Sequence, residues 1–209
     1  MSFNGAIRYG AILADPPWRF ATWSERGKGR CPDGWRDGQG NRWRAGGVRH
    51  YETMSMAEIM AMPVEAAAAD DCALFLWVTK PTLPAALDVG RSWGFEYKTR
   101  AFCWIKTTKH GKRHMGMGHW TRANPEDCLL FTRGAPKRLA RDVRELVEAP
   151  VREHSRKPDE IYDRIERLVA GPYLELFART RRDGWDQWGD QAGRWSSEEM
   201  PESQLEIVL

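Results

Sequence analysis

Three short runs of apolar residues constrain the fold most strongly. They are Tyr9–Ala14, Cys72–Val78 and Tyr173–Ala178, and each is far shorter than the ~20 residues of a membrane span. A strand that reads as a solid apolar run is buried on both faces, as the strands of a parallel sheet are. Helix-like segments separate the runs, so the sequence predicts an α/β fold with a mainly parallel central sheet.

Helices and further strands are predicted from capping signals and periodicity. Pro158–Leu168 is the clearest helix, because Pro158 suits its first turn and Asp159 and Glu160 favour its dipole. The other predicted elements are helices over Thr53–Met62, capped by Ser55 or Thr53 and ended by Pro63, and over Pro84–Trp93, ended by Gly94, and strands over Glu96–Lys106 and Asp127–Thr132.

Length and composition predict one domain over residues 1–191, followed by an acidic tail over residues 192–209. With 42% hydrophobic and 29% charged residues, the chain is not disordered throughout. Its four cysteines form no Cys-x-x-Cys pair, which argues against a zinc knuckle and against a disulfide-stapled secreted domain. We therefore expect a cytoplasmic protein with no membrane contact.

The most informative motif is Asp15-Pro16-Pro17-Trp18, directly after the first apolar run, where α/β sheets place ligands. The exocyclic amine of adenine is a poor nucleophile because its lone pair is delocalised into the ring, so a catalyst must accept its hydrogens. The Asp15 carboxylate and the Pro16 carbonyl can do this, on a backbone that two prolines stiffen. Trp18 offers a face on which a base can stack. The alternative is a structural turn with a core tryptophan.

Further motifs follow this tetrapeptide and cover nearly all of residues 8–191. They are Tyr51-Glu52-Thr53-Met54-Ser55, Leu74-Phe75-Leu76-Trp77-Val78-Thr79, Trp93-Gly94-Phe95, Gly118-His119-Trp120, Glu126-Asp127-Cys128-Leu129, Ser155-Arg156-Lys157-Pro158-Asp159-Glu160-Ile161-Tyr162, Glu166-Arg167-Leu168, Glu175-Leu176-Phe177-Ala178-Arg179 and Trp185-Asp186-Gln187-Trp188-Gly189-Asp190-Gln191. In this order the motifs resemble the MT-A70 family of DPPW-type N6-adenine methyltransferases, which includes the catalytic subunit of the eukaryotic mRNA adenosine methyltransferase.

The resemblance implies a Rossmann-like class I methyltransferase in permuted order, with the catalytic motif first and the strand for S-adenosylmethionine (SAM) last. Asp15 would be the catalytic carboxylate and would also lie near the amine of SAM. Lys157 would face the carboxylate of the SAM methionine moiety, as a flexible ammonium just ahead of a helix N-terminus suits an anion. Without this context, Lys157 would read as a solvated lysine.

The resemblance also implies roles for residues farther from the first motif. Arg179, Asp190 and Gln191 would bind the SAM ribose, and Tyr51 and Glu126 would lie near the acceptor base. Relatives pair through the region around the central loop, so a homodimer is a further expectation.

Three departures from the family pattern concern the adenine side of the SAM pocket. The family usually has Gly at Ala178, often has His-Asn at Arg181-Arg182, and has Asn at Asp190. Glu175, within the last strand, suits a structural salt bridge as well as a ligand contact.

Positive charge gathers in two segments. Residues 19–50 are Gly-, Arg- and Trp-rich and hold eight Arg/Lys against three Asp/Glu, and residues 106–122 hold five Arg/Lys and no Asp/Glu. We expect both to flank the active site and to hold phosphates, with Lys106, Lys109 and Arg113 among the contacts.

The tryptophans of the first segment, Trp23, Trp35 and Trp43, would stack on unpaired bases or wedge a duplex. A flexible, solvated loop is the alternative. His110, His114 and His119 could suggest a metal site, but the intervening Gly111 argues against a firm helix, and we expect no metal.

SAM-dependent methylation of the adenine amine in DNA is the leading hypothesis, because the chain is compact and supplies its own basic loop. The same reaction on RNA adenosine is the first alternative. A non-catalytic nucleic-acid-binding partner is the second, although such relatives typically lack the aspartate that is Asp15 here. Methylation of an amine in a protein or small molecule is disfavoured by the basic segments.

Overall fold

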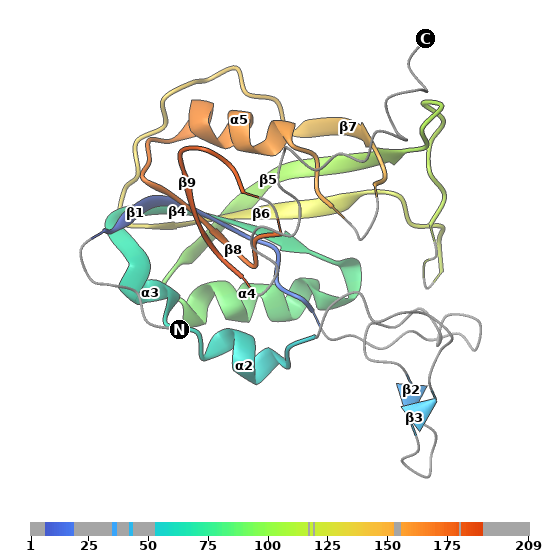
Figure 1. The fold of residues 1–209 in the computed structure, drawn as a ribbon, viewed down its shortest axis with the longest axis horizontal. Helices are drawn as coiled ribbons and strands as arrows, with labels where there is room; N and C mark the ends of the chain where they lie inside the picture. Colours follow the sequence, from blue (N-terminus) through green and yellow to red (C-terminus); the bar gives the residue numbers. More distant parts are fainter. Residues whose placement is uncertain are drawn as a thin grey trace.

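The computed structural model describes residues 7–18, 35–36, 42–43, 53–116, 118, 120–152, 156–179 and 181–189, with the backbone alone at 35–36 and 42–43. Its centre is a twisted seven-stranded sheet in the order β7-β5-β6-β4-β1-β8-β9 (Figure 1). The strands are β1 (Tyr9–Ala14), β4 (Ala68–Val78), β5 (Glu96–Thr107), β6 (Glu126–Arg133), β7 (Leu146–Pro150), β8 (Tyr173–Leu176) and β9 (Trp185–Trp188). A separate antiparallel pair joins β2 (Trp35–Arg36) to β3 (Arg42–Trp43).

The sheet is mainly parallel, as predicted. β1 pairs in parallel with β4 and with β8, β8 pairs in parallel with β9, and β5 with β7. β6 is antiparallel to both of its neighbours, β4 and β5. The amino end of β6 therefore lies at the same edge as the carboxyl ends of the other strands, and this edge carries the candidate site.

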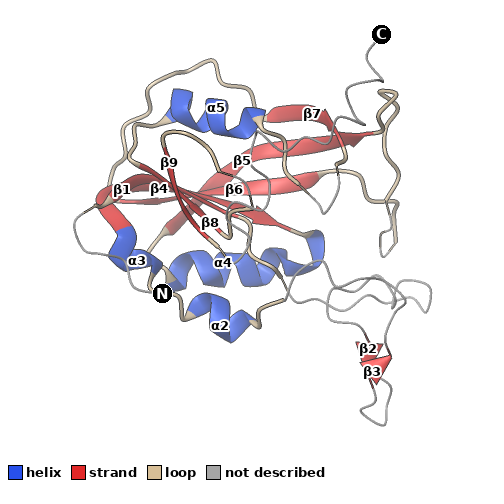
Figure 2. Cartoon of the chain, in the orientation of Figure 1, coloured by secondary structure: helices blue, strands red, loops and turns tan. Residues whose placement is uncertain are grey.

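Helices cover the sheet on both faces (Figure 2). The helices α2 (Met56–Met60), α3 (Val64–Ala67) and α4 (Leu83–Ser92) lie on one face, and α5 (Glu160–Leu168) lies on the other. One apolar core forms between the sheet and the first group, around Leu74, Leu76 and Trp93. The second forms under α5, around Trp77, Trp104 and Ile161.

The helix predicted over Thr53–Met62 is shorter in the structure, and Ser55 rather than Thr53 is its cap. The Ser55 side chain accepts from the backbone N–H of Glu58, and the Glu58 carboxylate accepts from the Ser55 N–H, so a full capping box starts the helix at Met56. Pro63 ends this helix but also stands directly before α3, a further single turn that the sequence did not indicate.

Two edge strands, β7 and β9, were not predicted. β7 (LVEAP) has one buried residue, Val147, and β9 (WDQW) has one, Trp185, so neither carries a recognisable apolar run. Both form by pairing in parallel with the backbone of a neighbour, β7 with the twelve-residue strand β5 and β9 with β8. The predicted Tyr173–Ala178 strand ends at Leu176, because Phe177 has a positive φ of 64°.

Among the described residues, no helix is long and apolar enough to cross a membrane.

Gly90 on α4 lets this helix lie directly on the sheet, and its replacement by alanine tests that packing. A Cβ at Gly90 would stand 2.2 Å from Cε1 of the fully buried Phe131. Alanine favours helices over glycine by about 1 kcal/mol, but overpacking of a closed core costs about 1–3 kcal/mol. We expect Gly90→Ala to lower the free energy of unfolding in urea by up to about 2 kcal/mol net. Asp88→Ala, on the exposed face of α4, is the control, and equal stability of both variants would contradict this packing.

Candidate active site

Asp15 stands at the carboxyl end of β1, one of the central strands of the sheet. The backbone that follows is held tightly. The Trp18 N–H donates to the Pro16 carbonyl at 2.8 Å, and the Met54 N–H donates to the Pro17 carbonyl at 3.1 Å. The Pro16 carbonyl thus keeps one lone pair for a further donor. This short, stiff segment carries the carboxylate out of the sheet at the edge where α/β folds bind ligands.

Trp18 does not offer its ring to a base, and that prediction is wrong for this structure. The residue is 4% exposed, and its Nε1 donates to the Trp77 carbonyl at 3.0 Å. It belongs to the apolar core beside α2 and α4. Its only hydrogen-bond donor is satisfied, so the buried indole anchors the turn. For Trp18, the structure therefore agrees with the alternative interpretation of the motif, a structural turn with a core tryptophan.

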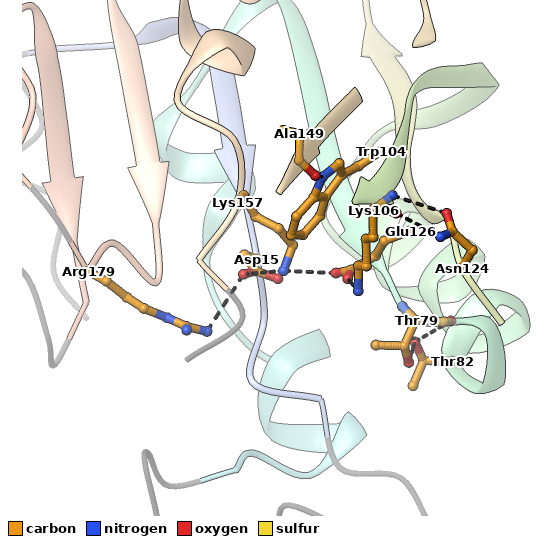
Figure 3. Close-up of polar contacts among 10 residues, drawn as sticks. All are labelled: Asp15, Thr79, Thr82, Trp104, Lys106, Asn124, Glu126, Ala149, Lys157 and Arg179. Carbon is orange, nitrogen blue, oxygen red and sulfur yellow. Dashed lines mark hydrogen bonds and ion pairs between the residues drawn. The ribbon is translucent and has the colours of Figure 1, made fainter. Parts of the chain in front are cut away.

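Lys157 brings the strand ends together. Its Nζ lies 2.8 Å from Asp15 Oδ2 and 2.8 Å from Glu126 Oε1. Figure 3 shows the ammonium between the two carboxylates. Burial alone would lower the pKa of the Lys157 ammonium, but the carboxylates of Asp15 and Glu126 outweigh burial and raise the pKa above its ordinary value. Lys157 is therefore charged and held in place by residues 142 and 31 positions earlier in the chain.

Glu126 begins β6, and its side chain is 9% exposed. Its second oxygen, Oε2, lies 2.6 Å from Lys106 Nζ at the end of β5. Burial would raise the pKa of the Glu126 carboxyl, but Lys157 and Lys106 together hold that pKa below its ordinary value. Charges thus alternate in a row from Arg179 through Asp15, Lys157 and Glu126 to Lys106 (Figure 3).

Lys106 was predicted to hold phosphate, and the structure instead turns it inward onto Glu126. Its ammonium also lies 4.8 Å from the centre of the Trp104 ring. Asn124 holds the Lys106 backbone by accepting from its N–H and donating to its carbonyl. Lys109 and Arg113 behave differently, since both are exposed and Arg113 pairs with Glu148 on the surface at 3.0 Å.

A cleft opens beside this row of charges. Its lining includes the predicted residues Asp15, Lys157 and Arg179, together with Trp77, Phe177 and Glu175. Arg179 follows β8, and its NH2 lies 3.7 Å from Asp15 Oδ2. The predicted carboxylate, ammonium and guanidinium are thus brought together in one open site.

Several buried polar atoms lack a protein partner, and most of them belong to residues that line the cleft. Among the described residues these are Trp77 Nε1, Arg156 Nε and Glu175 Oε2, all on lining residues, and Gln187 Nε2 on β9. Buried polar groups are normally satisfied, so unsatisfied groups that converge on an opening suit a polar ligand. The pairing of Glu175 with Gln187 in the sheet register places two of these atoms on neighbouring strands. Sequence reasoning left the role of Glu175 open and did not single out Gln187.

Other predicted site residues lie outside the described residues. These are Tyr51, Asp190, Gln191, Trp23 and His119, and the side chains of Trp35 and Trp43. Their expected roles stay predictions. Thr79, which follows β4 at the same edge, caps the short helix η1 (Lys80–Thr82) through bonds with Thr82. The described residues contain no group of three or more His, Cys, Asp or Glu side chains that could hold a metal.

Comparison with known proteins shows the family of the chain. The model of the MT-A70 family matches residues 9–191. The type II methyltransferase M.MunI of Mycoplasma sp is 33% identical over 203 residues, which cover 96% of this chain and 81% of that protein. The N(6)-adenosine-methyltransferase MT-A70-like protein of Drosophila melanogaster is 37% identical over 190 residues, or 88% of this chain and 27% of that protein. The N(6)-adenosine-methyltransferase catalytic subunit METTL3 of Homo sapiens is 35% identical over 128 residues, or 58% of this chain and 22% of that protein.

A Rossmann-like sheet with a polar cleft at its carboxyl edge, and these relatives, define a methyltransferase. The chain belongs to the MT-A70 family and is an adenine-N6 methyltransferase. It spans about a quarter of the length of the Drosophila and human relatives and most of the Mycoplasma enzyme.

Glu175 makes the stability of the protein depend on pH. Burial raises the pKa of its carboxyl to about 7, against the hydrogen bond that Tyr162 donates at 3.0 Å. Because the folded state then holds this proton more tightly than the unfolded state does, stability falls as pH rises from about 4.5 to about 7, by up to about 1.4 kcal/mol per pH unit.

We expect Glu175→Gln, which keeps the acceptor for Tyr162, to remove this contribution. The variant would be more stable than the wild type at pH 8 and gain no such advantage at pH 4.5, in urea unfolding at both values. Glu96→Gln, at an exposed position, is the control. A difference between Glu175→Gln and the wild type that stays constant with pH would contradict the assignment.

Proposed function

We propose that the protein transfers a methyl group from SAM to the exocyclic N6 amine of adenine in DNA. The observation that carries this proposal is the position of Asp15. Its carboxylate lies at the open edge of the sheet, on a stiff proline backbone, within one cleft with Lys157 and Arg179.

The chain's own groups suit the amine. The Asp15 carboxylate and the remaining lone pair of the Pro16 carbonyl accept the two hydrogens, which leaves the nitrogen lone pair free to attack. SAM, when bound, would supply the methyl group, and its sulfonium sulfur would keep the electrons of the S–C bond that breaks as the new N–C bond forms. The surplus proton of the amine passes to the Asp15 carboxylate. Because the base must reach this edge of the sheet, the target adenine leaves the stack.

The cleft also suits the cofactor. The methionine end of SAM carries an ammonium, which matches the carboxylate of Asp15, and a carboxylate, which matches the ammonium of Lys157. The ribose hydroxyls match the unsatisfied atoms Glu175 Oε2 and Gln187 Nε2. Trp77 and Phe177 add aromatic surface to the lining.

A surface rich in positive charge supports a polyanionic substrate. Lys109, Lys112, Arg113 and Arg122 are exposed and follow directly from the strand that carries Lys106. Trp120, in the same segment, is 93% exposed. Cations near an active site hold phosphates, and an exposed indole can stack on a base. DNA is preferred to RNA because the Mycoplasma relative, matched over 81% of its length, is named as a type II methyltransferase.

Replacing the catalytic carboxylate tests the reaction. We expect Asp15→Asn, which keeps the side-chain shape, to lower methyl transfer by about 10²–10⁴-fold, as loss of an acid–base group does. The measurement is incorporation of labelled methyl from SAM into duplex and single-stranded DNA, with N6-methyladenine identified after digestion. Asp70→Asn, an exposed carboxylate at the opposite end of β4, should keep full activity. No methyladenine from the wild type with any nucleic acid would refute the proposed function.

Competition between DNA and RNA oligonucleotides of matched sequence decides the substrate. We expect preferential methylation of DNA, and affinity that falls steeply with added salt. The variant Lys109→Gln with Lys112→Gln should bind DNA more weakly and show a salt slope shallower by about 1–2, because two phosphate contacts are lost. Preferential methylation of RNA would assign the same chemistry to RNA adenosine instead.

A further inference from the structure

We infer that Lys106 is a positioning residue of the SAM site, which holds Glu126 so that Glu126 can anchor Lys157 when a bound ligand competes for Asp15. This inference rests on the proposed function. It replaces the expected contact between Lys106 and phosphate with a role inside the protein.

The competition for Asp15 follows from the observed contacts. Lys157 Nζ and Arg179 NH2 both approach the same oxygen, Asp15 Oδ2, at 2.8 and 3.7 Å. The ammonium of SAM, or the amine of the acceptor adenine, must use this carboxylate in the proposed reaction. Lys157 then loses part of its interaction with Asp15 and relies on Glu126, whose Oε1 lies 2.8 Å from its Nζ.

Glu126 can hold the Lys157 ammonium in this state only while its carboxylate is ionised and fixed in position. It is buried, and a buried carboxylate without a partner for its second oxygen would take up a proton or shift. Lys106 supplies that partner at 2.6 Å.

The surroundings of Lys106 are built to hold it in this orientation. Asn124 binds both polar groups of its backbone, and the Trp104 ring lies beneath its ammonium. The indole Nε1 of Trp104 donates to the Ala149 carbonyl at 2.9 Å, which ties that ring to β7 (Figure 3). The side chain of Lys106 is 22% exposed, whereas Arg113 in the following loop is 70% exposed. A cation held in this way is poorly placed to reach a phosphate.

The experiment is a double-mutant cycle on SAM binding by the full chain, measured by titration calorimetry. We expect Lys106→Met, which keeps the length of the stem, to weaken SAM binding about tenfold, the equivalent of one pKa unit. Lys106→Arg should restore affinity to within about threefold, because the charge is retained. Glu126→Gln should weaken SAM binding by itself, and adding Lys106→Met to it should cause less than a further twofold loss, because Lys106 acts through Glu126.

Lys98→Met is the matched control. Lys98 lies on the same strand, far from the site, and pairs with Glu96 at 2.7 Å. It should bind SAM as the wild type does. Thermal unfolding of each variant separates a loss of folding from a loss of affinity, because a merely structural role for Lys106 would lower the melting temperature without the non-additive pattern of the cycle.

The pH profile gives a second readout. The charged and titratable groups that interact with Glu126 are Lys106, Lys157 and Cys128, and Asp15 lies beyond Lys157. Without Lys106, Glu126 takes up a proton at a higher pH than in the wild type and releases Lys157. We therefore expect the affinity deficit of Lys106→Met to grow from pH 8 to pH 5.5, and the difference made by Lys106→Met in the Glu126→Gln background to stay flat.

The outcomes separate the inference from the proposed function. If the wild type binds SAM and Lys106→Met binds it equally well, the inference is overturned while the proposed function stands. If Lys106→Met instead weakens DNA binding with a shallower salt slope, Lys106 is a phosphate contact. If the wild type binds no SAM at all, the proposed function fails and the inference fails with it.

Discussion

The ion pairs of the Lys157 ammonium, whose side chain is 13% exposed, are the interactions on which the site depends. An ammonium withdrawn from water is costly unless carboxylates surround it, and breaking one partner of a buried pair typically costs about 3–5 kcal/mol. Two carboxylates meet this one, Asp15 from the end of β1 and Glu126 from the start of β6, each at 2.8 Å. The same contacts that make the lysine tolerable also set the distance between the catalytic motif and the turn before α5. The same ion pairs therefore stabilise this edge of the sheet and fix the geometry of the catalytic motif.

Much of the fold could be predicted from the sequence, because the strands that form its centre are continuous apolar runs. β1 and the buried part of β4 coincide with such runs, and α5 carries its own start signals. The edge strands β7 and β9 could not be found in the same way. Each has one buried residue, so pairing to a neighbour rather than hydrophobic pattern makes them strands.

In the site, too, some residues could be predicted from the sequence and others could not. Asp15, Lys157 and Arg179 could be identified from motifs, and the structure brings them into one cleft. Two other assignments failed because a sequence does not show which way a side chain faces. Trp18 turns into the core, and Lys106 turns onto Glu126 rather than outward. In the sequence, Lys106 stands at the end of an alternating strand, and Glu126 opens a separate motif later in the chain. Only the antiparallel register of β5 and β6 brings Lys106 and Glu126 together.

The position of β1 in the sheet bears on how the chain is made. β1 lies between β4 and β8, and its parallel partner β8 spans Tyr173–Leu176. On the ribosome, β1 therefore waits with one hydrogen-bonding side open until β8, far later in the chain, has been synthesised. An apolar strand in that state is a ready template for other nascent chains. The centre of the sheet is therefore completed only once β8 has been made, and until then the catalytic turn that follows β1 stands at the end of a strand that lacks one neighbour.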